Sequence, residues 1–443
     1  MRSFKELFKN NSTNMKKSQG VEKDSQLVHL EQFSNKNIEN NSMGEKNPSF
    51  LFENKIIKKL WQKKKLKVAL VHDFLVNWGG AEKVLEDLAK IFPEAPIYTL
   101  IYDKEKMRGK FSNKNIRTSF LQKFPKFIKY RFRRYLLPFM PTIPETFDLR
   151  DFDLVISSSG AWSKGIVTRL NTVHIAYIHS PMRFVWDYSE KYLQDIGKKI
   201  GFCKRLFLSY LRVWDYQAAQ RPDILIANSK YTQERIKKYY RRESQVIHPS
   251  LSEKFSKNKE TKKQNNAEIV KTRDIFNDSV KNYFLVVSRL SAYKKIDLVV
   301  EAFNKLELPL VVIGEGDQKK YLQKIAQKNV KILGWKSDKE LKKYYQDARA
   351  FIFPTIDDFG LTIIEAMSFG VPVIAIRKGG AKEILKENVT GEFFDAQTVE
   401  VLSDGVRRFL ENEKKYSKSV ITKRAKDFSI SKFKKQITSI ISQ

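Results

Sequence analysis

The chain has 443 residues with 42% hydrophobic content, which excludes a wholly disordered protein and allows two domains with sizeable cores. Its single cysteine, Cys203, excludes an internal disulfide; no apolar run approaches the roughly 20 residues of a membrane span, and the N-terminus has no apolar signal-peptide core, so we expect a cytoplasmic protein. The formal net charge of +33 indicates an anionic partner, such as nucleic acid, an acidic membrane or a phosphorylated substrate, or it reflects lysine-rich coding alone.

Residues 1–66 are predicted to form an extension ahead of the folded domains. Residues 1 to about 48 are rich in Asn, Ser, Lys and Glu and have no sustained apolar period, which is typical of disorder. Residues 50–67, FLFENKIIKKLWQKKKLK, mix large apolar side chains with a lysine run. This end of the extension is either a short basic amphipathic helix on a membrane surface or a charged leader to the first strand.

Residues 67–251 are predicted to form a first Rossmann-like domain. The apolar run KVALVHDF is typical of a buried parallel strand, and Gly79 and Gly80 follow it in a loop ahead of the helical pattern AEKVLEDLAKIF. Further strands are expected at APIYTLI, DLVISSS, TVHIAYIH, ILIANS and SQVIH. The two glycines would let the backbone approach a ligand closely, although a turn with positive φ would also need glycine.

A second Rossmann-like domain is predicted over residues 282–443, ending in a C-terminal helix. Residues 252–281 are polar and rich in Lys and Asn, so we expect them to link the domains. The runs YFLVVSRL, LPLVVIG, NVKILG, RAFIFPT and VPVIAI alternate with helical segments, which indicates a parallel sheet flanked by helices. Two such domains facing a central cleft would place ligands beyond the carboxyl ends of the strands.

The most informative motif is FPTIDDFGLTIIEAM, in which Asp357 and Glu365 lie eight positions apart. If residues 361–369 form a helix, Asp357 and Phe359-Gly360 lie in the loop at its N-terminus and Glu365 lies one turn further in. Amides at a helix N-terminus attract anions, and carboxylates accept hydrogen bonds from sugar hydroxyls. The combination suits a nucleotide-sugar, although two acids at this spacing also occur in solvated loops.

Cations and an aromatic residue follow two other predicted strands. Arg289 and Lys294 come at the end of YFLVVSRL, where they can neutralise a diphosphate, Arg by bidentate hydrogen bonds and Lys as a point charge. The alternative is two surface cations in a lysine-rich chain. Gly334 and Trp335 end the run NVKIL, and Trp335 either stacks on a base or is an aromatic residue at a rim.

His179 ends the strand in AYIHSPMRFVWDY, where a histidine is either structural or close to a ligand. His174 lies within the same strand with opposite parity, and we expect it to pack. Asp151 and Asp153 match a metal-binding DxD motif by letter, but Asp153 abuts the strand DLVISSS. Since the other histidines show no metal-like spacing with acids or with Cys203, no metal or other cofactor is expected.

Taken in chain order from residue 67 to about 409, these motifs resemble the family 4 glycosyltransferases of GT-B fold. The resemblance is closest to bacterial enzymes, often mannosyltransferases, that build lipopolysaccharide O-antigens and other surface polysaccharides. It implies an α/β protein that moves a hexose, with retention, from a nucleoside diphosphate sugar to a glycan or lipid-linked acceptor. The departures are Asp357 where Glu is usual, Lys295 where Gly is usual, and an unusually long N-terminal extension.

The resemblance also implies roles for the site residues. Arg289 and Lys294 would stabilise the departing diphosphate, Glu365 would hold the ribose, Asp357 would hold the sugar with the backbone of the residues after it, and His179 would lie beside the sugar hydroxyls. The glycine loop would cover the diphosphate or the acceptor. The donor-binding set is therefore predicted to be Gly79, Gly80, Arg289, Lys294, Gly334, Trp335, Asp357, Phe359, Gly360 and Glu365, and the catalytic pair His179 and Asp357.

Two other functions stay open. A GT-B enzyme without transfer, such as a nucleotide-sugar 2-epimerase, would carry similar motifs. The charge alone would suit a nucleic-acid-binding protein, but no helix-turn-helix, zinc-finger or aromatic RNA-binding motif is present, so we expect no nucleic-acid partner.

Residues 106–134 hold eleven basic residues and no acid, interleaved with aromatics. They predict peripheral contact with the anionic inner face of the cell membrane. Alternatively, they form a solvated helix with its apolar side in the core.

Overall fold

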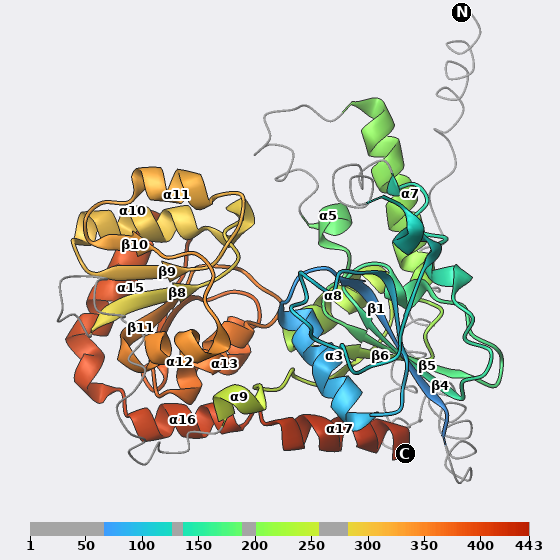
Figure 1. Ribbon diagram of the computed structural model, residues 1–443. Coiled ribbons are helices and arrows are strands. Elements are labelled where there is room, and N and C mark those ends of the chain that lie inside the picture. Colours follow the sequence, from blue (N-terminus) through green and yellow to red (C-terminus); the bar gives the residue numbers. More distant parts are fainter. Residues whose placement is uncertain (1–65, 126–135, 188–200, 257–281, 443) are drawn as a thin grey trace, which may run out of the picture. The chain divides into compact units, whose positions relative to one another are not determined.

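The computed structural model describes residues 66–125, 136–187, 201–256 and 282–442 (Figure 1). These residues fall within one compact unit. Apart from Leu66, the predicted extension lies outside them, and so do most of the predicted linker and residues 126–134 of the basic segment. The predictions of disorder and of a basic amphipathic helix in the extension therefore concern residues outside the described part of the chain.

The first domain is built on a parallel sheet of seven strands in the order β3-β2-β1-β4-β5-β6-β7. Its strands are β1 (Val68–Leu75), β2 (Ile97–Tyr102), β3 (Ile116–Thr118), β4 (Leu154–Ser159), β5 (Val173–Ile178), β6 (Ile224–Ala227) and β7 (Gln245–Val246). Its helices are α3 (Gly80–Ile91), α5 (Arg183–Trp186), α7 (Phe202–Ala218) and α8 (Lys230–Tyr240), with 3-10 turns η1 (Phe120–Lys123), η3 (Pro144–Thr146) and η4 (Ser163–Gly165). The six strands predicted from apolar runs are confirmed; the short edge strand β3 has no such run and was not predicted.

The second domain is built on a parallel sheet of six strands in the order β10-β9-β8-β11-β12-β13. Its strands are β8 (Tyr283–Val287), β9 (Leu310–Ile313), β10 (Val330–Ile332), β11 (Ala348–Phe353), β12 (Val373–Ile376) and β13 (Gly391–Phe394). Its helices are α10 (Ile296–Leu306), α11 (Lys319–Ile325), α12 (Asp338–Asp347), α13 (Leu361–Ser368), α14 (Ala381–Ile384), α15 (Val399–Asn412) and α16 (Lys418–Lys426), with 3-10 turns η5 (Ala292–Lys294) and η6 (Glu413–Lys415). Of the six strands in this sheet, only β13 was not predicted.

In each parallel sheet, the strand order switches from one side to the other at the first strand of the domain. β1 pairs with β2 on one side and with β4 on the other, and β8 pairs in the same way with β9 and β11. Loops after neighbouring strands then diverge at these points, and open α/β sheets bind ligands outside the carboxyl ends of the strands there. The glycine loop follows β1, Arg289 follows β8 and Asp357 follows β11. The topology therefore places three predicted motifs at such positions.

Local signals explain where several helices begin. Ser229 caps α8 through its side chain, and Thr398 caps α15 in the same way. Ser337 and Glu340 form a capping box at the start of α12, in which each side chain bonds to the other residue's backbone N–H. Among the described residues, no helix combines the length and apolar character needed to cross a membrane.

The chain crosses between the domains at two places that differ from the predicted boundaries. Residues Leu251 and Phe255, the latter in the short helix α9 (Glu253–Ser256), pack in the core of the second domain, although the linker was predicted from residue 252. The last helix, α17 (Ile430–Ser442), buries Phe433 and Ile437 in the core of the first domain rather than the second (Figure 1). Apolar spacing shows that a helix has a face to bury, but not which sheet it covers.

An ion pair lies inside the first domain. Lys164 Nζ is 2.5 Å from a carboxylate oxygen of Asp215, and the two side chains are 1% and 0% exposed. The other oxygen of Asp215 accepts hydrogen bonds from Trp186 Nε1 at 2.7 Å and from the Tyr240 hydroxyl at 2.8 Å. The Asp215 carboxylate on α7 therefore connects this helix with η4, α5 and α8.

Candidate functional site

The two predicted carboxylates lie in the turn between β11 and α13 and within α13 itself. Gly360 has φ +108°, a conformation that side-chain-bearing residues rarely adopt, and a β-carbon there would lie 2.9 Å from Ile363 Cδ1. The helix α13 begins at the next residue, so Asp357 lies in the loop and Glu365 lies one turn into the helix. The loop–helix arrangement predicted from the sequence is confirmed.

Asp357 is held by one cation from each domain. One of its oxygens accepts a hydrogen bond from Lys294 Nζ at 2.7 Å, and the other accepts one from Arg183 Nη2 at 2.7 Å. Burial on its own raises the pKa of the Asp357 carboxyl, but Lys294 and Arg183 outweigh it and hold the pKa well below the usual range. Asp357 is therefore an anion wherever the protein is folded at ordinary pH.

The neighbouring Asp358 strengthens this connection. It is buried and accepts hydrogen bonds from both Arg183 and Arg235, and Arg235 also pairs with Asp187. Arg183 in α5 and Arg235 in α8 belong to the first domain, so the ion pairs cross between the domains. The sequence did not identify either arginine; its only signal was that Arg183 lies four residues after His179.

The two predicted diphosphate cations differ in their surroundings. Lys294 ends η5, is engaged with Asp357, and accepts a hydrogen bond from Thr355 through its backbone carbonyl at 2.9 Å. The Arg289 side chain is exposed, and no carboxylate among the described residues pairs with it. A β-carbon on Gly79 would lie 3.7 Å from Arg289 Nη2. Arg289 therefore lies beside the glycine loop with its hydrogen-bond donors available.

The departure at Lys295 has a conformational consequence. Lys295 has φ +54°, in the left-handed region, where a β-carbon costs roughly 1–2 kcal/mol. Allowing for the greater chain entropy that glycine adds to the unfolded state, Lys295→Gly is expected to stabilise the protein by about 0.5–1 kcal/mol. Urea or thermal unfolding measures it. The control Lys305→Gly, in the last turn of α10, should destabilise by about 1 kcal/mol; equal effects of both substitutions would contradict the prediction.

Glu365 is buried and paired with a residue of the first domain. One of its oxygens accepts a hydrogen bond from Lys83 Nζ, and the other accepts one from the Tyr345 hydroxyl at 3.2 Å. Lys83 lies in the first turn of α3, and a β-carbon on Gly80 at the start of that helix would lie 3.1 Å from Leu361 Cδ1. The glycine loop and α3 therefore contact the first turn of α13. Lys83 was not predicted.

Glu383 makes a further connection between the domains. Its carboxylate accepts hydrogen bonds from the backbone N–H groups of Lys230 and Tyr231, at the start of α8, and from His248 Nε2 at 2.9 Å. Burial raises the Glu383 pKa, but these donors prevail and the pKa lies below its usual value. The carboxylate therefore caps a helix of the other domain.

The ring of Phe359 is not available to a ligand. It is 4% exposed and stacks on His248, with ring centroids 5.4 Å apart and planes inclined at 23°. Only the backbone of Phe359 can therefore contribute to the predicted sugar contacts, as the motif implied.

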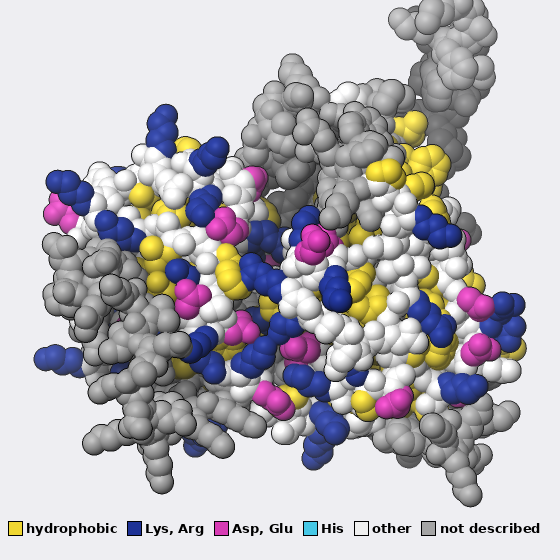
Figure 2. Space-filling view, viewed as in Figure 1, with side chains coloured by type: hydrophobic (Ala, Val, Ile, Leu, Met, Phe, Trp, Pro, Cys, Tyr) yellow, Lys and Arg dark blue, Asp and Glu magenta, His cyan; other side chains and the backbone are white. Residues whose placement is uncertain are grey.

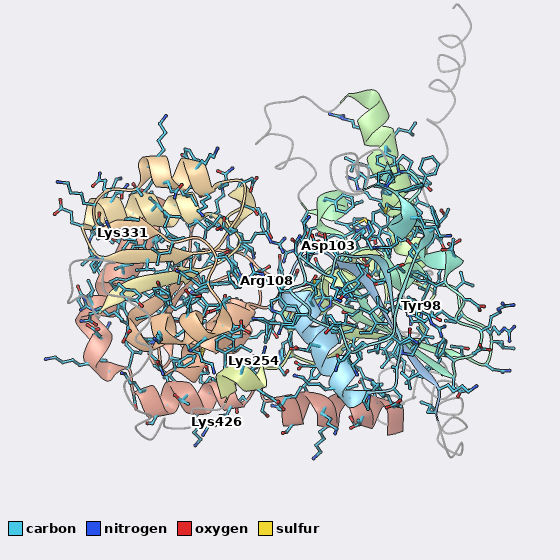
Figure 3. All side chains as sticks on the ribbon, viewed as in Figure 1. Tyr98, Asp103, Arg108, Lys254, Lys331 and Lys426 are labelled. Atoms are coloured by element: carbon cyan, nitrogen blue, oxygen red, sulfur yellow. The ribbon has the colours of Figure 1, made fainter. Side chains whose placement is uncertain are left out.

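The predicted base site lies at the ends of β9 and β10. Gly334 has φ +73°, and its carbonyl accepts a hydrogen bond from Gly314 N at 2.8 Å. The Trp335 ring is 51% exposed. The guanidinium of Arg108, a residue of the first domain labelled in Figure 3, lies 3.1 Å from the ring centroid in a cation–π contact. Trp335 is thus a surface aromatic residue with one face already covered.

His179 directly follows β5. Its Nε2 lies 2.7 Å from Ser158 Oγ, and its backbone carbonyl accepts a hydrogen bond from Asn228 Nδ2 at 2.9 Å. Burial, with a smaller contribution from the nearby His72, lowers the His179 pKa to about 4, so the ring is neutral at physiological pH. His174 is fully buried, which confirms that it packs in the core.

Two family models match the chain. The model described as Glycosyltransferase Family 4 matches residues 78–252, and the model described as Glycosyl transferases group 1 matches residues 270–427. The chain belongs to the family 4 glycosyltransferases. The two matches divide between the two sheets and contain every predicted site residue.

Relatives of this glycosyltransferase match it over different lengths. An uncharacterized glycosyltransferase of Methanocaldococcus jannaschii is 22% identical over 82% of this chain and 93% of that protein. O-antigen chain mannosyltransferase C of Escherichia coli is 26% identical over 30% of this chain and 38% of that protein. A second M. jannaschii glycosyltransferase is 31% identical, and this match spans 35% of its length.

A solved structure shares the fold of this glycosyltransferase. HepE of Anabaena in complex with UDP superposes with a TM-score of 0.62 at 18% identity, covering 85% of this chain and 100% of that one. The same protein has been solved with UDP-glucose, with a TM-score of 0.60. The similarity shows that the glycosyltransferase has the GT-B fold.

The DxD letters of this glycosyltransferase have a structural role. The Asp153 carboxylate accepts a hydrogen bond from Lys67 N at 3.0 Å, at the start of the neighbouring strand β1. Within the described ranges, no group of three or more His, Cys, Asp or Glu side chains is placed to hold a metal ion.

Proposed function

We propose that the protein is a cytoplasmic, retaining glycosyltransferase that moves a hexose, with mannose as one candidate, from a nucleoside diphosphate sugar to a glycan or lipid-linked acceptor. The observation that carries the proposal is the convergence of Asp357, Glu365, Lys294 and Arg289 around the start of α13 and the glycine loop. Support for the donor class comes from HepE, solved with UDP and UDP-glucose, and support for mannose from the name of the E. coli relative.

The proposed roles follow from where charge develops. As the bond between the anomeric carbon and the diphosphate oxygen breaks, negative charge grows on the diphosphate. A new bond forms to the acceptor oxygen, whose proton passes to the departing diphosphate. Arg289 and Lys294 are suited to stabilise that charge. Protein cations supply this stabilisation in the proposed transfer, without a metal or other cofactor.

Donor binding would exchange partners within the site. Lys294 is engaged with Asp357, and Lys83 with Glu365, so all four side chains are already positioned without a ligand. A diphosphate on Lys294 would release one oxygen of Asp357 to accept a hydrogen bond from a sugar hydroxyl. The ribose would in turn compete with Lys83 for Glu365. The site therefore holds its two carboxylates close to cations before the donor arrives.

A thermal-shift panel of nucleotide-sugars and free nucleotides tests the donor class. A ligand at 100 times its dissociation constant should stabilise the protein by about 2.7 kcal/mol. Transfer of labelled sugar to an acceptor should follow with the same donor. Donor consumption that needs no acceptor would favour a 2-epimerase. Salt-dependent binding to single or duplex strands with no nucleotide-sugar affinity would favour nucleic-acid binding.

The distribution of charge bears on that last alternative. Lys and Arg side chains are spread across the visible described face instead of forming one stripe (Figure 2). Nucleic-acid-binding domains usually gather them on one face or along a helix. The spread favours the transferase over nucleic-acid binding.

His179→Ala is expected to lower kcat more than donor affinity. The proposed contacts of His179 are to the sugar at the reacting centre, and contacts that strengthen in the transition state change turnover rather than ground-state binding. Steady-state kinetics and donor titration separate the two quantities. Loss of thermal stability with unchanged specific activity would show instead that His179 only packs.

We also propose peripheral contact with an anionic membrane. The basic side chains chosen for its test, Lys126, Lys129, Arg131 and Arg133, lie outside the described residues. Phe120 and Phe124, which precede these residues in the chain, are 47% and 37% exposed. Each Lys or Arg near an anionic leaflet contributes about 1 kcal/mol.

Salt-sensitive binding to anionic vesicles is expected, and changing the four basic residues to Gln together should weaken it. Co-sedimentation with vesicles at low and high salt measures it. Absence of binding at low salt would refute membrane contact without affecting the transferase proposal.

A further inference from the structure

A line of polar side chains runs behind His179. His179 Nε2 lies 2.7 Å from Ser158 Oγ, and the same hydroxyl lies 3.1 Å from His72 Nδ1. The other nitrogen of His72 faces Glu82, with 3.6 Å between His72 Nε2 and Glu82 Oε1. His72 and Ser158 are 2% and 0% exposed, so little else can bond to them. His72 lies in β1, Glu82 in α3 and Ser158 in β4, and His179 directly follows β5. Two hydrogen bonds and one electrostatic contact therefore form one chain from Glu82 to His179.

Both ends of this chain lie at the proposed donor site. A β-carbon on Gly79 would lie 3.0 Å from Glu82 Oε2, so Glu82 borders the glycine loop. Arg183, four residues after His179, pairs with Asp357. The chain therefore connects the glycine loop with the residue proposed to lie beside the donor sugar.

Asp73, the other acid nearby, does not compete for His72. Its two oxygens accept hydrogen bonds from four successive backbone N–H groups, of residues 160 to 163, at 2.6 to 2.8 Å. A carboxylate has about four acceptor sites, and these donors fill them. Glu82 is therefore the carboxylate that faces the ring of His72.

The donors and acceptors of the four side chains determine which atom donates in each hydrogen bond. A carboxylate can only accept hydrogen bonds, so a His72 ring with one proton carries it on Nε2, towards Glu82. His72 Nδ1 then accepts, and the Ser158 hydroxyl donates to it. The same hydroxyl oxygen is left to accept from His179 Nε2–H. His179, which is neutral, then has no proton on Nδ1.

The residue His179 is partly exposed, unlike the neighbouring histidine. His174 is 0% exposed, bonds to Ser157 through Nε2 at 2.8 Å, and has its Nδ1 buried without a hydrogen-bond partner among the described residues. Ser157 and Ser158 are successive residues of β4, so the two Ser–His pairs lie on opposite faces of the sheet. Only the pair at His179 leads to a ring that is not fully buried.

We propose that Glu82, acting through His72 and Ser158, selects the tautomer of His179 and leaves its Nδ1 as a hydrogen-bond acceptor for a hydroxyl group of the reacting sugar. The inference rests on the proposed function, which places His179 beside that sugar. Glu82, His72 and Ser158 are positioning residues: they do not touch the sugar, and they determine what His179 presents to it.

The ¹⁵N chemical shifts of the histidine rings test this directly, since the protein has only five histidines and their signals can be told apart. In the wild type, His179 should carry its proton on Nε2. Glu82→Gln supplies an amide that can donate to His72, so a substantial population of His179 should shift its proton to Nδ1. Glu82→Asp keeps a carboxylate and should retain the wild-type tautomer. Ser157→Ala is the matched control, since it removes the corresponding hydroxyl at His174 and should leave the His179 signals unchanged.

Kinetics provides a second measurement. Loss of one well-placed hydrogen bond in the transition state is worth about tenfold in rate, so kcat of Glu82→Gln and Ser158→Ala should fall about tenfold. Donor affinity should stay within about twofold, and Glu82→Asp should recover most of the loss. Ser157→Ala should keep wild-type kcat. Thermal unfolding of each variant excludes misfolding as the cause.

A His72 ring that carries both protons would donate to Ser158 and reverse the chain. A wild-type His179 with its proton on Nδ1 would therefore overturn the inference, as would an unchanged tautomer in Glu82→Gln. A wild type that shows the expected tautomer but transfers no sugar from any donor would overturn the proposed function and, with it, the role of His179 in transfer.

Discussion

Asp215→Ala is expected to destabilise the protein by about 3–5 kcal/mol, because removal of one partner leaves the other charge buried without compensation. Lys164, 1% exposed, would lose its counter-ion, and the Trp186 indole N–H and the Tyr240 hydroxyl would lose their acceptor. Urea unfolding monitored by tryptophan fluorescence measures the change. A loss below about 1 kcal/mol would show that water or a neighbouring group replaces the carboxylate.

Two matched variants make this result interpretable. Asp148 forms an ion pair with Arg150 at 2.7 Å, but the side chains are 61% and 65% exposed, so Asp148→Ala should change stability far less than Asp215→Ala. The double substitution Lys164→Met with Asp215→Leu replaces the buried charges by apolar groups. It should recover much of the stability, because the desolvation cost of a buried pair often exceeds its Coulombic gain.

Arg289→Ala and Glu365→Gln are each expected to weaken donor binding at least about tenfold, since loss of a charged hydrogen-bond partner costs about 1.5–3 kcal/mol. The Arg289 guanidinium is exposed beside the glycine loop, so its removal leaves no buried charge behind. Glutamine at position 365 keeps the shape that packs against Lys83 and Tyr345, and only the charge is lost. Calorimetric titration with the donor identified in the thermal-shift panel measures the effect.

An exposed arginine far along the chain provides the control. Arg407 on α15 pairs with its helix neighbour Asp404, and both side chains are well exposed. Arg407→Ala should leave donor affinity and turnover at the wild-type level. If Arg289→Ala and Glu365→Gln also behave like the wild type, neither residue holds the donor.

The sequence predicted most of the fold because the strands are continuous apolar runs. Strands β1 and β8 are buried on both faces, and such runs are recognisable without knowledge of their neighbours. Strands β3 and β13 were not predicted, since their sequences, IRT and GEFF, include Arg, Gly or Glu among few apolar residues. The side that α17 covers was not predictable either, because its apolar face would suit either sheet.

The residues of the candidate site also fall into those that the sequence could predict and those that it could not. Arg289, Lys294, Asp357 and Glu365 could be predicted because each follows a strand within a short recognisable motif. Lys83, Arg183 and Arg235 could not, since their partners lie more than 100 residues away in the chain. The contacts that link Glu82 with His179 could not be predicted either, because they depend on the tertiary structure. Ser158 of β4 bridges His72 of β1 and His179, which follows β5.

The position of α17 has a consequence for synthesis of the protein. Phe433, Ile437 and Ile440, each at most 5% exposed, belong to the core of the first domain, yet they follow the second domain in the chain. Domains generally fold as units during translation, the N-terminal one first. Part of the apolar surface of the first domain therefore stays exposed until the second domain and α17 have been synthesised. A chain that ends before residue 430 would keep that surface exposed, so premature termination should yield an aggregation-prone product rather than a shorter enzyme.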